Sequence, residues 1–287
     1  MKRILLFIVA IILHINSYSQ IPQGYYDSTI GKSGYELKTE LYKIISKNHK
    51  PLSYNALWTA FERTDMLKDS IIWDMYSYPP IKGYINPYTY KYPTDEERKK
   101  IKPRNEEGQC YNREHSFPKS WFGGEQKPMY TDLFHIYPTD KKVNSVRENY
   151  PYGNYDIKKP LLYTSQNGSK LGYCRNADSL GDIIVFEPID EYKGDFARTY
   201  FYMATRYQDK IAGWKNNSIY SSQVLAGNNS TVYQTWYIKL LLEWHKLDPV
   251  SSKEINRNNA VYLKQLNRNP FIDSTNFVER IWKSKNK

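Results

Sequence analysis

Apolar residues recur at intervals of three and four in several parts of the chain, the spacing that places them on one face of an α-helix. Between Ser33 and about Asn48 this stripe consists of Leu37, Leu41, Ile44 and Ile45. Ser33 can cap this helix, and Ser53 can cap a second one that carries Leu57, Trp58 and Phe61. Two more helices are expected over Asp195–Tyr207 and Thr235–His245.

Strand patterns are fewer and shorter. Ile71–Tyr76 and Asp182–Phe186 are runs of apolar and β-branched residues. A third strand, Cys110–Ser116, must stop at Phe117-Pro118, because a proline forces the preceding residue into extended geometry and cannot continue a ladder. Residues 77–109, rich in Pro, Tyr and Lys, read as a loop. The chain is therefore expected to mix helices and strands, with helices dominant.

A short helix is expected downstream of the third strand. Thr139 or Asp140 can cap it, and Lys141–Glu148 forms its body. Asn144 and Arg147 are three residues apart on it, so they share a face. The order is strand, loop and helix, with a histidine at the strand end and an asparagine on the helix.

The N-terminus has the pattern of a secretory signal peptide. Two basic residues, Lys2 and Arg3, precede an apolar run from Ile4 to Leu13, and small residues precede a cut after Ser19. The alternative is a membrane anchor, but a span needs about 20 apolar residues. We therefore expect residues 1–19 to be removed and the mature protein to be secreted or periplasmic, without stable membrane association.

Residues 20–287 contain no linker rich in Gly or Ser and no internal repeat, so one domain and a monomer are expected. The formal charge is +11, and loss of Lys2 and Arg3 leaves +9. An exported basic protein suggests a polyanionic partner. The alternative is that the lysines serve solubility alone.

The chain has two cysteines, Cys110 and Cys174. In an exported protein we expect a disulfide between them, because a structural zinc site needs four ligands and no Cys-x-x-Cys spacing is present. Two unpaired thiols are the alternative.

The chemically suggestive residues cluster around Glu114-His115, although the whole chain has only five histidines. An imidazole can accept a proton from water near neutral pH, and oxygens of Glu114 and Asn144 are ligands that Mg²⁺ prefers. Arg113 or Arg147 could hold a phosphate in a bidentate contact. Such a set suits phosphodiester hydrolysis.

Each of these residues also has a structural interpretation. A histidine on a strand is often a hydrogen-bonded structural residue, and Asp132 and His135 could simply brace the loop. Neighbouring strand residues point to opposite faces, so Glu114 and His115 can serve one site only if the strand ends or twists there.

Longer stretches carry a family resemblance. They are YNREHSFPKSWF from Tyr111, TDLFHIYPTDKKVNSVRENYPYG from Thr131, ARTYFYMATRY from Ala197 and NRNPFID from Asn267. Together they resemble the bacterial endonuclease I family, exported non-specific nucleases of the His-Me finger (ββα-metal) type, over about residues 25–282. The resemblance implies a single α+β domain with a ββα-metal core in a mainly helical fold. It also implies a divalent metal, usually Mg²⁺, and cleavage of DNA, often RNA as well, to 5′-phosphate products.

Position by position, the resemblance gives His115 the role of general base and makes Glu114 and Asn144 the metal ligands. Asp132 and His135 fall in the family's loop that braces the site, with Arg113 beside it as a supporting residue. The family's transition-state arginine lies in a loop that is much shorter here. We take Arg147 as its candidate.

Three positions depart from the family pattern. Phe134 stands where many relatives have a histidine, Ser145 where glycine is common, and Glu148 where a small residue is common. The rival hypothesis is a non-catalytic basic module that binds extracellular DNA or an acidic polysaccharide. It explains the charge and the export signal, but it leaves the spacing of base, ligands and bracing residues unexplained.

Overall fold

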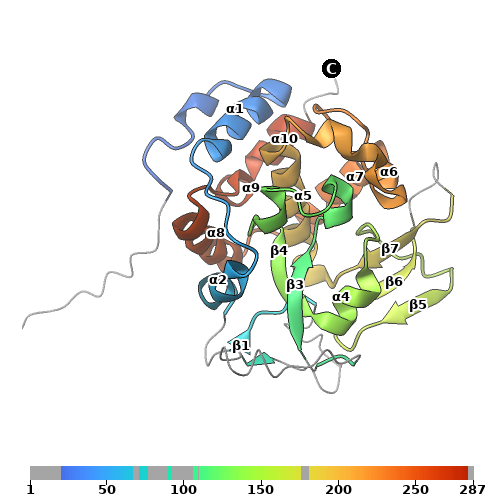
Figure 1. Cartoon of the computed structure of the whole chain (residues 1–287). Coiled ribbons are helices and arrows are strands. Elements are labelled where there is room, and N and C mark those ends of the chain that lie inside the picture. Colours follow the sequence, from blue (N-terminus) through green and yellow to red (C-terminus); the bar gives the residue numbers. More distant parts are fainter. Residues whose placement is uncertain are drawn as a thin grey trace, which may run out of the picture.

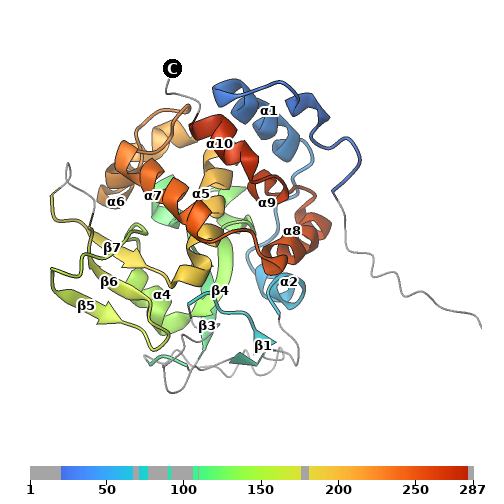
Figure 2. The same cartoon turned by 180° about the vertical axis from the view of Figure 1, so that it is seen from behind.

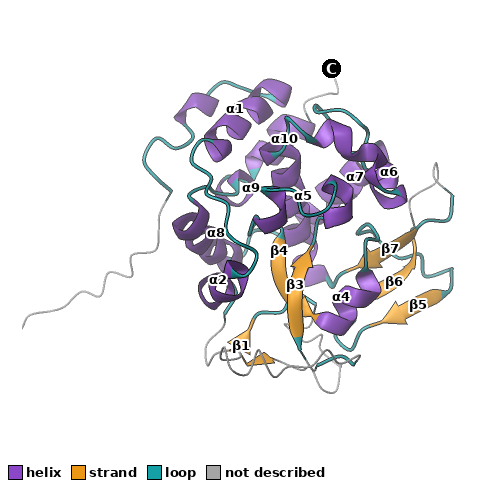
Figure 3. Cartoon of the chain, viewed as in Figure 1, coloured by secondary structure: helices purple, strands orange, loops and turns teal. Residues whose placement is uncertain are grey.

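The computed structural model describes residues 21–66, 71–76, 90–91, 106–108, 110–175 and 181–283. The expected signal peptide, residues 1–19, and most of the expected loop at 77–109 lie outside the described residues. Figure 3 shows helices above and to the left, with strands in the centre and lower right.

The helices of the described part are α1 (Gly34–Ser46), α2 (Ala56–Thr64), α4 (Lys141–Arg147), α5 (Lys193–Arg206), α6 (Ile219–Val224), α7 (Thr235–Leu247), α8 (Ser252–Gln265), α9 (Pro270–Asp273) and α10 (Asn276–Trp282). The strands are β1 (Ile71–Ile72), β2 (Tyr90–Lys91), β3 (Tyr111–His115), β4 (Ile136–Asp140), β5 (Leu161–Thr164), β6 (Lys170–Tyr173) and β7 (Ile184–Glu187). They form three antiparallel sheets, β1-β2, β3-β4 and β5-β6-β7.

The β3-β4 pair lies at the centre of the molecule, and α4 follows it directly (Figure 1). The register pairs Tyr111 with Asp140 and His115 with Ile136. Asp140 ends β4 and also caps α4, because its side chain accepts the Val143 N–H at 2.8 Å. Because of this cap, α4 starts directly after the last residue of β4, and α4 packs against β3.

Helix α5 supports the pair from the other side (Figure 2). Its residues from Lys193 to Thr205 are all buried, as expected for a helix packed on every face. Thr199 Oγ1 lies 2.6 Å from the Tyr137 hydroxyl of β4, and the Tyr200 hydroxyl donates to the Ser116 carbonyl at 2.9 Å. The strand end that carries His115 is therefore fixed to the most buried helix of the described chain.

The expected helices are present as α1, α2, α4, α5 and α7, and the expected strands at 110–116 and 182–186 are present as β3 and β7. The mixture of helices and small antiparallel sheets agrees with the expected α+β class. The strand at Ile71–Tyr76 is shorter than expected, because Asp74 accepts the Tyr76 N–H and turns the chain after Ile72. Among the described helices, none has the length and apolar character to cross a bilayer.

The expected disulfide is absent from the structure. Cys110 precedes β3, where its carbonyl accepts the Lys141 N–H at 3.0 Å. Cys174 directly follows β6 and pairs with Tyr155 through main-chain atoms in an isolated β-bridge. It therefore lies next to the β5-β6-β7 sheet, whereas Cys110 lies next to the β3-β4 sheet. Both thiols are free in the structure, so it does not show the expected disulfide.

The start of β4 depends on a buried ion pair between α8 and the end of α2. Arg257 donates to both oxygens of Asp65, at 2.8 and 3.3 Å, and its Nη2 also reaches the carbonyls of Leu133 and Ile136. Both side chains are almost fully buried.

We expect Arg257→Ala to lower the free energy of unfolding by about 3–5 kcal/mol, because it leaves the buried Asp65 carboxylate without its partner. Urea titration followed by tryptophan fluorescence measures the change. Arg63→Ala on the exposed face of α2 is the control, and it should change stability by less than about 0.5 kcal/mol. Equal effects of the two substitutions would contradict the proposed importance of the pair.

Candidate functional site

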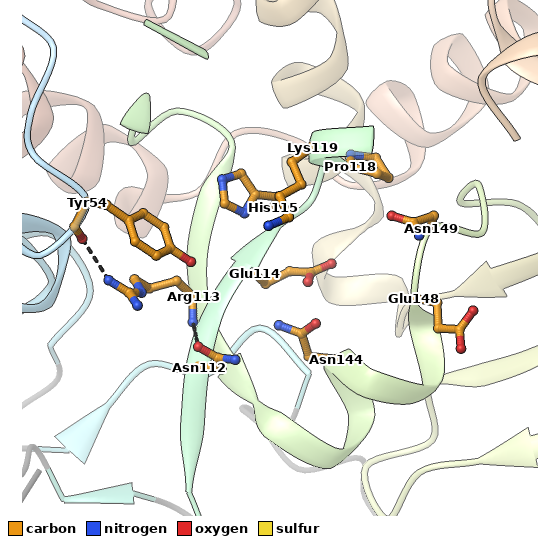
Figure 4. Close-up of a pocket in the computed structure, with 10 residues that line it drawn as sticks. All are labelled: Tyr54, Asn112, Arg113, Glu114, His115, Pro118, Lys119, Asn144, Glu148 and Asn149. Atoms are coloured by element: carbon orange, nitrogen blue, oxygen red, sulfur yellow. Dashed lines mark hydrogen bonds between the residues drawn. The ribbon is translucent and has the colours of Figure 1, made fainter. Parts of the chain in front are cut away.

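A pocket of about 230 Å³ opens where the end of β3 faces α4 (Figure 4). Its lining consists of Tyr54, Asn112, Arg113, Glu114, His115, Pro118, Lys119, Asn144, Glu148 and Asn149. The lining includes Glu114, His115 and Asn144, the residues that the sequence singled out as base and metal ligands. β3 ends at His115, and this is why two neighbouring residues of one strand reach the same pocket.

His115 is held in one orientation by the main chain of the following loop. Its Nε2 lies 3.1 Å from the Tyr130 carbonyl, which can only accept, so Nε2 carries the proton and Nδ1 keeps its lone pair. The imidazole stacks on the Tyr130 ring at 5.3 Å. Burial, with smaller effects from His135 and Lys119, lowers the pKa of His115 to about 3. The ring is therefore neutral at pH 7.

Glu114 is buried, and one of its two carboxylate oxygens accepts hydrogen bonds from the protein. Its Oε1 accepts hydrogen bonds from Arg147 and from the Tyr76 hydroxyl, both at 2.8 Å. The other oxygen accepts none from any residue that the structure describes, and Figure 4 shows the carboxylate beside the Asn144 amide. Burial raises the pKa of Glu114, although Arg147 and Tyr76 oppose this.

Asn144 is in the middle of α4, and its half-buried side chain lines the pocket. The main-chain carbonyl of Asn144 accepts the Glu148 N–H at 3.0 Å at the end of the helix. Glu148 has a φ of 48°, a conformation that glycine adopts more readily. The departure from the family pattern at Glu148 therefore places an exposed carboxylate on the pocket lining, in a strained backbone conformation.

Arg147, the candidate for the transition-state arginine, does not line the pocket. It is only 1% exposed, and it donates to Glu114, to the His115 carbonyl at 3.0 Å and to the Ser116 carbonyl at 2.7 Å. Burial would lower the pKa of Arg147, but Tyr152 and Glu114 outweigh it and raise the pKa. The guanidinium of Arg147 therefore holds Glu114 and the end of β3 in place and lies outside the pocket lining.

Arg113 lines the pocket but is also engaged. Its Nη1 donates to the Tyr54 carbonyl at 2.8 Å, and its guanidinium carbon lies 3.5 Å from the centre of the Tyr54 ring and 4.4 Å from that of Trp58. Figure 4 shows Tyr54 between Arg113 and His115. Arg113 thus fixes the position of the Tyr54 ring, which lies beside the His115 imidazole.

Asp132 and His135 lie behind the pocket, fully buried. Asp132 accepts the hydroxyls of Tyr202 and Tyr207 at 2.8 and 2.7 Å, together with the Gln265 amide at 2.8 Å. Burial alone would raise the pKa of Asp132, but these donors and two nearby histidines lower it. His135 Nε2 contacts the Met129 carbonyl at 2.6 Å, and the rings of His135 and His115 are 5.5 Å apart.

The chain is similar in sequence to known nucleases over most of its length. The sequence model of the endonuclease I family matches residues 33–276. The chain belongs to the endonuclease I family. It is thus an endonuclease, a hydrolase of phosphodiester bonds.

Three curated relatives illustrate the range of the family. An extracellular ribonuclease of Bacillus amyloliquefaciens is 36% identical over 264 residues, which is 91% of this chain and 78% of the relative. An extracellular ribonuclease of Bacillus subtilis (strain 168) is 35% identical over 90% of this chain and 78% of its own length. Endonuclease-1 of Buchnera aphidicola is 28% identical over 50% of this chain and 46% of its own length.

Some residues of the endonuclease I site were not identified from the sequence. Tyr76 contacts Glu114 across 38 positions of the chain, so no local spacing indicates it. Lys119 and Tyr54 line the pocket, and only the nearness of Lys119 to His115 in the sequence could have indicated it. Phe134, where many relatives have a histidine, packs on Tyr202 with ring centres 4.7 Å apart and takes a core position.

We expect Asp132→Asn to destabilise the fold by about 2–4 kcal/mol, because an amide cannot accept all the donors that converge on the carboxylate. Urea unfolding provides the measurement. Asp209→Asn removes the same charge from an exposed position and should leave the midpoint unchanged. If both variants unfold at the same urea concentration, Asp132 does not hold the loop as described.

Proposed function

We propose that this enzyme is an exported, metal-dependent endonuclease without sequence preference that hydrolyses DNA and RNA to 5′-phosphate products. In this proposal β3, β4 and α4 form the ββα-metal core. One observation carries it: a neutral histidine with a fixed tautomer shares one pocket with a carboxylate oxygen and a side-chain amide. The names of the extracellular ribonuclease relatives support RNA as a substrate and support export.

The residues present fit a divalent cation at Glu114 and Asn144. Arg147 and Tyr76 occupy Oε1 of Glu114, while the second oxygen accepts no hydrogen bond from the described residues. Figure 4 shows the Glu114 carboxylate near the Asn144 side chain. A carboxylate and an amide oxygen are hard ligands of the kind that Mg²⁺ prefers. These two would be the protein ligands; the described residues contain no group of three His, Cys, Asp or Glu side chains that could hold a metal. When bound there, the ion would supply charge stabilisation for the phosphoryl group and the leaving oxygen.

His115 would act on the attacking water. The Tyr130 carbonyl holds the Nε2 proton, so the free Nδ1 lone pair can accept a proton from that water. As the proton moves to Nδ1, the water oxygen forms a bond to phosphorus and the bond from phosphorus to O3′ breaks. The leaving O3′ takes a proton from solvent, which leaves a 3′-hydroxyl and a 5′-phosphate. Stacking on Tyr130 keeps the ring from turning away.

The three site residues should respond differently to substitution. His115→Ala should lower the turnover of plasmid DNA and of RNA by at least about 10² to 10⁴-fold at every Mg²⁺ concentration, because it removes the base. Asn144→Ala should weaken metal binding, so its activity should recover in part as Mg²⁺ rises. The measurement is the cleavage rate across a Mg²⁺ titration, with excess EDTA expected to abolish wild-type cleavage.

His245→Ala is the matched histidine control, since His245 lies on α7 and does not line the pocket. Its cleavage rate should equal that of the wild type. Cleavage by His115→Ala at the wild-type rate would contradict the assignment of His115 as the base. Undiminished cleavage in excess EDTA would contradict the proposed metal dependence. A wild-type protein that binds nucleic acid and does not cut it would favour the basic binding module instead.

A further inference from the structure

The site needs a cation that can approach the substrate phosphate, and the two arginines nearest to it are both engaged. Arg147 is buried against Glu114 and two main-chain carbonyls. Arg113 is bound to the Tyr54 carbonyl and lies against the rings of Tyr54 and Trp58. Arg147 thus lies outside the pocket lining, and Arg113 lines the pocket with its Nη1 already bonded and its guanidinium held between two aromatic rings and the Tyr54 carbonyl.

Lys119 is placed differently. Its backbone is fixed, because it begins the 3₁₀ helix Lys119–Phe122, whose Trp121 and Phe122 side chains are buried. Its carbonyl accepts the Gly124 N–H at 2.8 Å. Next to it, the Ser120 hydroxyl donates to Asn149 at 2.9 Å and joins this turn to the segment that follows α4. The side chain of Lys119 thus starts from a rigid point on the pocket rim.

The ammonium group of Lys119 remains available. Its side chain is 51% exposed and lines the pocket beside His115, with Nζ 5.7 Å from the centre of the Tyr130 ring (Figure 4). Its described acidic partner is Glu125, at 3.7 Å, and that carboxylate is 67% exposed. An exposed pair at this distance contributes little, so a phosphate can replace Glu125 without a large loss.

We propose that Lys119 contacts a non-bridging oxygen of the scissile phosphate and stabilises the negative charge that grows on it during hydrolysis. This inference rests on the proposed function of the same pocket. Figure 4 shows Lys119 and Asn144 on opposite sides of Glu114, so the lysine would contact the phosphate from the side away from Asn144. Lys119 takes the role that the sequence had suggested for Arg147, and as a point charge on a flexible stem it needs no bidentate geometry.

A dinucleotide substrate tests this contact, because its single phosphate excludes attraction to distant charges. Lys119→Ala should lower kcat/KM for the dinucleotide by about 10- to 100-fold, mainly through kcat, the usual cost of removing one charge-stabilising donor or somewhat less. Lys119→Arg should keep the rate within about threefold, because it keeps the charge. Lys127→Ala, an exposed lysine of the same loop that does not line the pocket, is the control and should change the rate less than twofold.

A second measurement separates a phosphate contact from damage to the metal site. The Mg²⁺ concentration that gives half-maximal activity should be unchanged in Lys119→Ala and raised in Asn144→Ala. Equal dinucleotide rates for Lys119→Ala and Lys127→Ala, with an active wild type and an inactive His115→Ala, would overturn the role of Lys119 alone. An inactive wild type would overturn the proposed function as well.

Discussion

The buried ion pair between Glu114 and Arg147 is the interaction on which the site depends. Arg147 is the last residue of α4, and with one guanidinium it binds the Glu114 carboxylate and the two carbonyls at the end of β3. Burying two charges costs several kcal/mol per ion, and close geometry with further hydrogen bonds offsets this cost. The pair therefore adds little net stability, and its main effect is to fix the position of α4 relative to the end of β3. It sets how far α4, and with it Asn144, lies from the strand end.

Behind the pocket, a second set of buried polar contacts holds the loop between the two strands. Asp132 accepts hydrogen bonds from Tyr202 of α5, from Tyr207 just after it, and from the last residue of α8, so two distant parts of the chain meet at this carboxylate. Arg257 adds a further link between α8 and the start of β4. The back of the site is therefore buried and hydrogen-bonded, whereas the rim residues Lys119 and Glu148 are exposed. The exposed rim is where a substrate can approach without disturbing the buried contacts.

The sequence predicted the strand, loop and helix of the site because the signals are local. Pro118 marks the end of β3, and Asp140 supplies the cap of α4. It placed Arg147 on the same helix face as Asn144 but could not show that its guanidinium is buried, since Glu114 and Tyr76, which pack there, come from distant segments. The strand β4 was not predicted because Pro138 interrupts its pattern, and a two-stranded sheet tolerates a proline at its edge.

The start of α8 could have been predicted from the sequence, because Ser251 and Glu254 have the spacing of a capping box. A disulfide was expected from the compartment and the lack of a zinc-site spacing, and no local pattern shows whether Cys110 and Cys174, 64 positions apart, approach each other.

The partner of the His115 imidazole is the Tyr130 carbonyl, which carries no net charge. A histidine paired with a carboxylate keeps a strong affinity for protons whether or not a substrate is present. His115 has no such partner, and burial holds its pKa low. Since the contact is made by the main chain, replacement of the Tyr130 side chain leaves in place the hydrogen bond that fixes the tautomer of His115.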